Sequence, residues 1–145
     1  MKKMFVFVFS LLLPVLPLFF PSGRAGTQIA KENPLLTRAL PDISGKEGLI
    51  ERVVLSPGEA VPAHRHNADV FVYVLEGGIV TQLEGHKLQT VHTGEAFYES
   101  PADVHIASRN ASTTQPARLL VFFVKKIGAP ATVAITSANT IVKAH

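Results

Sequence analysis

From Gly48 onward, the chain alternates short, mostly apolar runs with clusters of turn-forming residues. The runs occupy residues 49–55, 60–66, 70–76, 79–84, 87–91, 96–99, 104–109 and 117–124. The segments between them are rich in Gly, Pro, Ser, Asn and Asp, as in SPGE, HTGE and SPAD. Many short strands separated by turns are typical of an all-β sandwich or barrel. The pattern therefore predicts an all-β fold.

Residues 70–76 are apolar on both faces of their expected strand. One face consists of Val70, Val72 and Val74. The other consists of Phe71, Tyr73 and Leu75. A strand with one face in water would alternate apolar with polar residues. We therefore expect one face to line a barrel interior, and the other to be covered by a second sheet or by a partner subunit.

The N-terminal segment differs from the rest. Two lysines precede an apolar run over residues 4–20, and small residues surround Ala25. This order is typical of a secretory signal peptide. A membrane anchor is disfavoured because two prolines interrupt the run and would break a helix. We expect residues 1–25 to be removed on export, with Ala30 as a second cleavage point, which leaves a secreted or periplasmic protein without stable membrane insertion.

The remaining chain divides into three parts. Residues 26–40 show weak periodicity, and we expect a linker followed by one extended piece at Leu35–Leu40. Residues 41–128 are expected to form the β domain. Residues 129–145 are expected to add an edge strand or to trail as a flexible end.

Charge and composition restrict the partners and ligands. The chain has 14 Lys and Arg and 11 Asp and Glu, and three of the basic residues but none of the acidic ones precede residue 26. Cleavage would leave 11 of each sign, which argues against a nucleic-acid partner. Because the chain has no cysteine, any metal must be held by His, carboxylate or amide groups rather than by thiolates.

Candidate metal chemistry begins with His64 and His66. Residues two apart in a strand point to the same face, so the two imidazoles are expected to enter one space. Imidazole is a good ligand for iron, zinc, copper and nickel. The spacing alone is also compatible with two ordinary surface or core histidines.

The context of these histidines resembles the first signature motif of the cupin superfamily. That motif is G-x5-H-x-H, followed by a glutamate and then a glycine, and it matches Gly58, His64, His66 and Gly77. The glutamate position of the motif falls at Val70, whose side chain cannot bind a metal.

A later stretch is similar to the second cupin motif, G-x5-P-x-G-x2-H-x3-N. Gly94 and His105 keep its spacing of eleven residues between glycine and histidine. Pro101 and Asn110 each lie one place late, and Asp103 is near the position of the second glycine.

The resemblance implies a small antiparallel β-barrel of two packed sheets, of the jelly-roll type, with one divalent metal ion inside. The implied ligands are His64, His66 and His105. The identity of the ion stays open among Fe, Mn, Ni, Zn and Cu.

Three interpretations of Val70 remain open. The three imidazoles alone bind the ion, as in some cupins such as thiol dioxygenases, or another side chain replaces the glutamate, or the barrel binds a ligand without metal. Among replacements we favour Glu99, on the strand that leads to the second motif, over Asp69, because strand parity turns Asp69 away from the direction of Val70 unless the loop bulges. Gln82 and Glu84, on a neighbouring hairpin, are further candidates.

Two classes of function follow from the resemblance. The first is a metal-dependent, dioxygenase-like enzyme that oxidises a small organic molecule. If the reaction needs a general base, Glu99 is the candidate. The alternative is a non-catalytic module that binds a small molecule or a metal. A homodimer is expected because cupins often pair through their sheets and because residues 70–76 are apolar on both faces.

Overall fold

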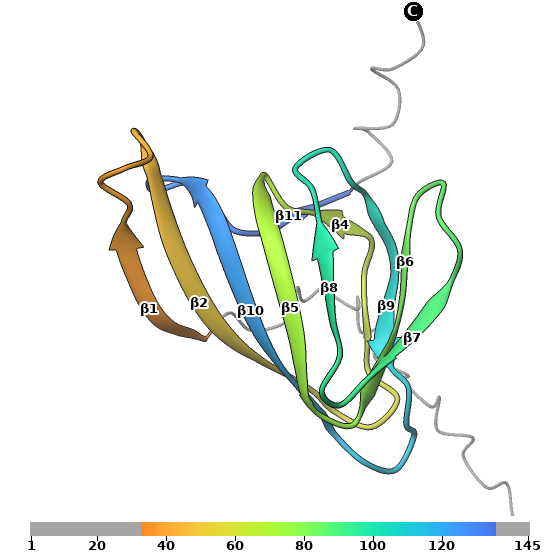
Figure 1. Ribbon diagram of the computed structural model, residues 1–145. Helices are drawn as coiled ribbons and strands as arrows, with labels where there is room; N and C mark the ends of the chain where they lie inside the picture. Colours follow the sequence, from red (N-terminus) through yellow and green to blue (C-terminus); the bar gives the residue numbers. More distant parts are fainter. Residues whose placement is uncertain (1–32, 136–145) are drawn as a thin grey trace, which may run out of the picture.

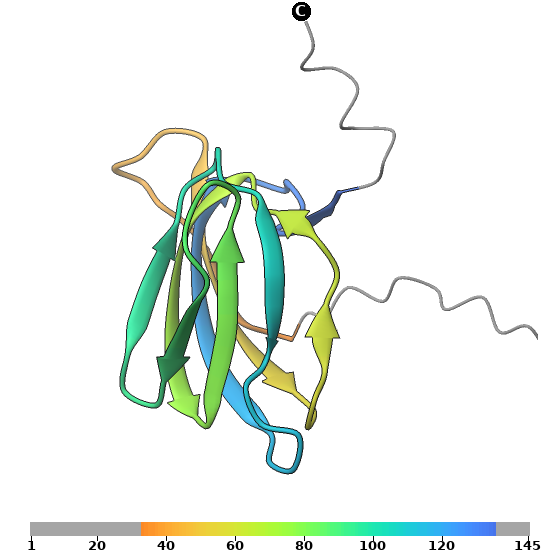
Figure 2. The same cartoon turned by 90° about the vertical axis from the view of Figure 1, so that its right-hand side faces the viewer.

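The structure, a computed structural model, describes residues 33–135. Within this range the chain forms eleven strands arranged in two antiparallel sheets that face each other (Figure 1; Figure 2). The all-β, two-sheet fold expected from the sequence is therefore confirmed. In this range there is no helix with the length and apolar character needed to cross a membrane. The expected signal segment lies outside the described residues.

The first sheet has five strands in the order β1-β2-β10-β5-β8. Their bounds are β1 Pro34–Ala39, β2 Lys46–Leu55, β5 Ala68–Glu76, β8 Ala96–Glu99 and β10 Ala117–Lys126. The central strands β2 and β10 pair over their full length, from Ala117 opposite Leu55 to Lys126 opposite Lys46. This long ladder forms one wall of the domain.

The second sheet has the order β11-β4-β9-β6-β7, and β3 also pairs with β9. Its strands are β3 Ala60–Val61, β4 His64–Arg65, β6 Gly78–Leu83, β7 Gln89–His92, β9 His105–Asn110 and β11 Val133–Ala134. The single strand expected over residues 60–66 is divided into β3 and β4. Pro62 lies between them and has no N–H to donate to a ladder, which accounts for the interruption.

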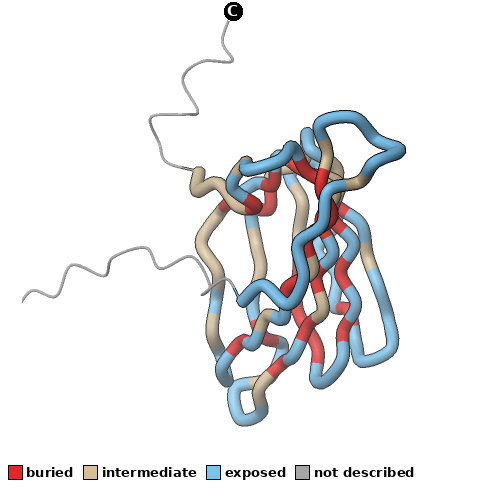
Figure 3. Tube along the Cα trace, turned by 90° about the vertical axis from the view of Figure 1, so that its left-hand side faces the viewer, coloured by how far each residue is buried: buried red, intermediate tan, exposed pale blue. Residues whose placement is uncertain are grey.

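Alternate residues of the strands enter the space between the sheets, as a period of two requires. In β10 the buried positions are every second residue, and in β5 they are Ala68 and the valines, which gives the set Ala117, Leu119, Val121, Phe123, Lys125, Ala68, Val70, Val72 and Val74. Figure 3 shows buried stretches interrupting exposed ones along the strands. The apolar core thus lies between the sheets and surrounds the site described below.

The outer face of β5 is open. Phe71, Tyr73 and Leu75 are 50%, 45% and 44% exposed, and the ring of Phe71 packs against those of Tyr98 and Phe122 on neighbouring strands. No second sheet covers this face within residues 33–135, so that part of our expectation is wrong. The facing sheet packs only on the valine side, because two sheets bury one inner face each.

A glycine turn and a buried amide side chain stabilise the ends of the strands. Gly77 makes the turn from β5 to β6 with φ 75°, and a Cβ there would lie 2.9 Å from the carbonyl oxygen of Pro116, so only glycine fits. Asn110, at the end of β9, is buried, and its amide nitrogen donates to the carbonyls of Leu55, Ser56 and Gln115 at 2.8–3.1 Å. Asn110 thereby joins the second sheet to the end of β2 in the first.

Candidate metal centre

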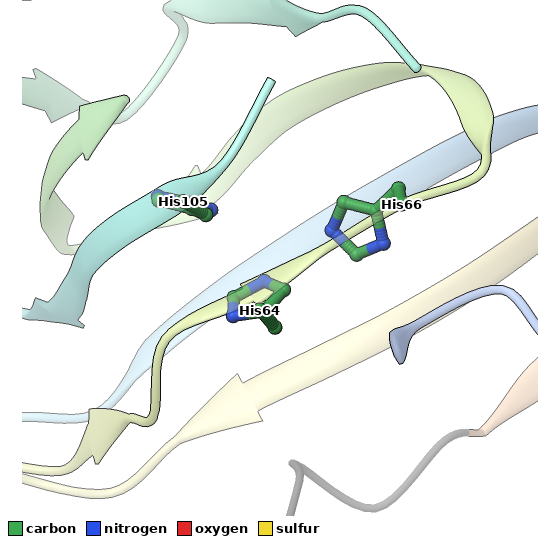
Figure 4. Close-up of side chains that lie close together, drawn as sticks. All are labelled: His64, His66 and His105. Carbon is green, nitrogen blue, oxygen red and sulfur yellow. The ribbon is translucent and has the colours of Figure 1, made fainter. Parts of the chain in front are cut away.

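Three buried histidines converge between the two sheets. His64 lies on β4, directly opposite His105 on β9, and His66 follows two residues later on the same side of the chain (Figure 4). The ring centroid of His64 is 4.9 Å from those of His66 and His105. One ligand nitrogen from each ring lies within 4.8 Å of the others. The structure therefore brings together the three residues that the motifs singled out.

Backbone carbonyls orient two of the rings. The Nδ1 of His64 donates to the carbonyl of Pro62 at 2.8 Å, and the Nδ1 of His66 donates to the carbonyl of Ala131 at 2.9 Å. A carbonyl only accepts, so each Nδ1 holds the proton of the neutral ring. Nε2 of both rings is then the nitrogen with a lone pair free to bind an ion.

The segment that supplies the Ala131 carbonyl is itself held by a buried ion pair. Lys125, at the end of β10, bonds to the carboxylate of Glu47 on β2 and donates to the carbonyl of Ala129 at 2.7 Å. The N–H of Gly128 donates to the same carboxylate at 3.1 Å. These bonds hold residues 128–129, two residues before the carbonyl that orients His66.

His105 is oriented by a side chain instead of a backbone carbonyl. Its Nε2 is hydrogen-bonded to the hydroxyl of Thr81 on β6. Its Nδ1 is buried. Among residues 33–135, this is the one buried side-chain nitrogen or oxygen atom that has no hydrogen-bond partner. A buried polar atom without a partner is costly, and a metal ion would satisfy it.

Glu99 provides a carboxylate to the same space. It is 3% exposed, and its oxygens lie 3.4 Å from Nδ1 of His105 and 3.6 Å from Nε2 of His66. Burial by itself would raise the pKa of this carboxyl, but the rings of His105, His66 and His64 outweigh burial and hold the pKa below its usual value. Glu99 is therefore an anion that faces two of the three histidines.

The electrostatic state of His64 also suits a ligand. Burial is the main cause that lowers the pKa of His64 to about 4, and the neighbouring rings of His66 and His105 lower it further, whereas the carbonyl of Pro62 opposes the shift. At neutral pH this ring is uncharged. A neutral imidazole is the form that binds a metal ion.

The other carboxylate and amide candidates lie away from the cluster. Asp69 accepts a hydrogen bond of 2.6 Å from the hydroxyl of Tyr98, whose ring stacks on the outer aromatic residue Phe71, as strand parity led us to expect. Gln82 donates to the carbonyl of His86 at 3.0 Å in the turn after β6, and Glu84 is exposed in that turn. None of the three lines the space around the histidines.

The histidines and Glu99 line a cavity of about 80 Å³ between the sheets. The other lining residues are mainly apolar and come from both sheets, among them Val53, Leu55, Val61, Val72, Ile79, Phe97, Leu119, Val121 and Phe123. The cavity also contains Glu51, a buried carboxylate on β2. The arrangement can hold an ion together with a small molecule beside it.

Sequence reasoning missed three residues of this site. Thr81 orients His105, the carbonyl of Ala131 orients His66, and Glu51 lines the cavity. Alternation along β2 and β6 predicts that Glu51 and Thr81 share a face with their buried neighbours, but alternation does not say which face is inner. The Ala131 contact spans 65 residues and leaves no local signal.

The donor set fits a divalent transition metal. Imidazole nitrogens with one carboxylate suit Fe, Mn, Ni, Zn and Cu, and the buried Nδ1 of His105 lies 3.4 Å from an oxygen of Glu99.

Comparison with known proteins agrees with this geometry. A family model described as a cupin domain matches residues 51–123, which include all three histidines and Glu99. A search among curated proteins finds no significant match for this chain.

Solved structures with the same fold include three informative examples. The protein TT1209 from Thermus thermophilus is 28% identical, with a TM-score of 0.51, and the match covers 70% of this chain and 89% of that one. An oxalate oxidase in complex with the substrate analogue glycolate is 26% identical, with a TM-score of 0.52, over 61% of this chain but only 46% of that one. An uncharacterized double-stranded β-helix protein from Klebsiella pneumoniae has 16% identity and a TM-score of 0.56, covers 78% of this chain and 90% of that one, and shows the fold alone.

Proposed function

This chain belongs to the cupin family, and from that premise we propose that it binds one divalent transition-metal ion through His64, His66, His105 and Glu99. The observation that carries the proposal is the buried Nδ1 of His105, which makes no hydrogen bond among residues 33–135 and lies 3.4 Å from a carboxylate oxygen of Glu99. Thr81 and two backbone carbonyls hold the rings in orientations that leave one nitrogen of each free for the ion.

The proposed activity is an oxygenase-type oxidation of a small organic molecule in the cavity. A bound divalent ion would supply Lewis-acid activation and open coordination positions for a substrate or for O₂. An ion that takes six ligands, such as Fe or Mn, would have room for a substrate or O₂ beside these four groups, whereas the same four groups would close a tetrahedral zinc site. A dioxygenation, in which both atoms of O₂ enter the substrate, needs no external reductant. The similarity to an oxalate oxidase bound to glycolate supports a small oxidisable substrate.

The residues of this chain would perform three tasks in that reaction. The apolar walls around Val72 and Val121 exclude water from the substrate. The carboxylate of Glu99 offsets the positive charge of the ion. Glu99 is also the group next to the histidines that is able to accept a proton from a substrate.

Metal analysis combined with oxygen consumption tests the proposal. Protein purified from its native host is expected to contain about one transition-metal ion per chain, and the His64→Ala/His66→Ala/His105→Ala variant should contain none. His86→Ala and His92→Ala alter exposed histidines outside the cluster and serve as controls. Stoichiometric metal in the triple variant would show that the proposed site is wrong.

The enzymatic part is tested separately. Iron(II)-loaded protein should consume O₂ with at least one member of a panel of phenols, thiols and diketones, and the triple-alanine variant should not. Full metal content without O₂ consumption across the panel would favour the non-catalytic binding module.

We further propose that the protein is exported and forms a homodimer. The apolar segment over residues 4–20, preceded by two lysines, supports export, and N-terminal sequencing of the exported protein should find a start near Gly26.

The exposed outer face formed by Phe71, Tyr73 and Leu75 supports a dimer. Sedimentation that shows only monomer at micromolar concentration would contradict the dimer.

A further inference from the structure

A buried ion pair lies on the inner face of the first sheet, one row away from the proposed ligand Glu99. Lys125 on β10 is directly opposite Glu47 on β2 and Ala68 on β5, and the adjacent row contains Phe123 and Glu99. Glu47 and Lys125 are 9% and 6% exposed. Lys125 thus occupies an inner position of β10, at which the strand otherwise carries Ala, Leu, Val or Phe.

Stability alone does not explain why these two positions are charged. Apolar side chains of similar volume often stabilise a fold as well as a buried ion pair does, because removing charges from water costs free energy. The pair does, however, bond to the backbone. The carboxylate of Glu47 accepts a hydrogen bond of 3.1 Å from the N–H of Gly128, and the ammonium group of Lys125 donates one of 2.7 Å to the carbonyl of Ala129. The pair therefore fixes the start of the segment that leads from β10 to β11.

This start is close in sequence to the carbonyl that orients His66. Pro130 alone separates Ala129 from Ala131, and the ring of a proline fixes its φ. Ala131 is 3% exposed, and its carbonyl accepts a hydrogen bond of 2.9 Å from Nδ1 of His66. The hydroxyl oxygen of Thr132 lies 3.3 Å from the same nitrogen. The placement of Ala129 therefore helps to determine where the acceptors for Nδ1 lie.

The segment is also held at its far end. Strand β11 follows and pairs with β4, with Ala134 opposite His64 (Figure 1). The N–H of Ile135 donates to the carbonyl of Ala63 at 3.0 Å. Because the segment is bonded at both ends, the carbonyl between them has little freedom to leave Nδ1 of His66.

From these contacts we propose that Glu47 and Lys125 are positioning residues of the metal centre. The pair sets the position of the Ala131 carbonyl, and that carbonyl keeps the proton of His66 on Nδ1, so that Nε2 binds the ion. Neither residue of the pair lines the cavity. The inference rests on the proposed metal-binding function, which it extends by assigning a role in that site to residues outside it.

The test separates positioning from stability by replacing both charges with apolar side chains. Glu47→Met/Lys125→Met should unfold at a urea concentration no lower than wild type, because no charge is then buried at these positions. Nitrogen NMR of the neutral imidazole rings in metal-free protein should show the proton of His66 on Nδ1 alone in wild type. In the double variant the proton should be shared between Nδ1 and Nε2. Zinc affinity, measured by competition with a chelator, should fall about 10- to 100-fold.

A second variant acts on the connection and leaves the ion pair intact. Pro130→Gly adds backbone freedom at an exposed position, so it should partly release the proton of His66 and lower zinc affinity about two- to fivefold. The matched control is Arg118→Met/Glu76→Met, which removes an exposed ion pair between β10 and β5. This control should leave the position of the proton and the zinc affinity unchanged.

The proposal is overturned if Glu47→Met/Lys125→Met folds and keeps the proton of His66 on Nδ1 alone. If that variant does not fold, Pro130→Gly decides, and an unchanged proton position in Pro130→Gly overturns the proposal. The position of the proton is measured without metal. A wild-type protein that binds no zinc would therefore contradict the proposed metal site, while the NMR measurement would still test the positioning role.

Discussion

Glu99 lies directly opposite Val70 in the ladder between β5 and β8, and both side chains are buried on the inner face of the first sheet. In the cupin motif, the position of Val70 is the one that holds the glutamate ligand. Side chains of directly opposed residues start only about 5 Å apart. The neighbouring strand therefore offers a carboxylate close to where the motif would have placed one.

Replacement of Glu99 by Gln should weaken metal binding roughly 10- to 100-fold, because the substitution removes the anion that faces two histidines. Metal affinity is measured by competition with a chelator of known affinity. Asp69→Asn is the control, since Asp69 is bonded to Tyr98 on the outer side, and it should leave the affinity unchanged. Unchanged affinity in Glu99→Gln would support a site made of three histidines alone.

The carboxylate should be transferable between the two strands. In Val70→Glu/Glu99→Val, the anion moves to the opposite position of the same inner face, and metal affinity should stay within about tenfold of wild type. Val70→Glu alone should lower the free energy of unfolding of the metal-free protein, because two carboxylates then oppose each other. A double variant that folds but binds no metal would contradict this relationship.

The stability of the metal-free protein should fall in acid. The pKa of His64 is about 4 in the folded state, against the ordinary value of 6.5, so the unfolded chain binds more protons between these values. Stability from this group is fully present above pH 6.5 and is lost as the pH falls towards 4, by on the order of 3 kcal/mol. The pKa of Glu99 is also held below its usual value, so its contribution is lost only at lower pH.

Urea unfolding at several pH values between 7 and 5 measures this loss. His64→Leu should flatten the pH dependence in that range, whereas His92→Ala, at an exposed position on β7, should retain it. An unchanged slope in His64→Leu would assign the proton uptake to another group.

Asn110→Ala should destabilise the fold by about 1–3 kcal/mol, because it removes a buried amide that serves three backbone carbonyls. Chemical unfolding measures the change, and metal affinity should not change, because Asn110 does not line the cavity. Gln89→Ala, at an exposed position on β7, is the control for loss of an amide side chain. A destabilisation no larger than that of the control would mean that the three hydrogen bonds make no net contribution to the free energy of unfolding.

Much of the fold could be predicted from local patterns. The eight runs expected from Gly48 onward correspond to strands, because period-two alternation and turn residues act over a few positions. The place of the edge strand β11 beside β4 was less accessible, since it depends on pairing with a strand far away in the chain. The sequence left open whether a second sheet or a partner subunit covers the outer face of β5, because an apolar strand face does not reveal what covers it.

By itself, the sequence determined that His64 and His66 share one face and that Asp69 and Val70 face opposite ways, because these relations depend only on the geometry of a single strand. The tertiary structure decided the rest. The convergence of His105 and Glu99 on that face, the choice of nitrogen in each ring, and the place of Glu51 depend on strand register and on contacts such as His66 to Ala131. Register is a property of paired strands far apart in the chain, and only packing of the whole domain selects it.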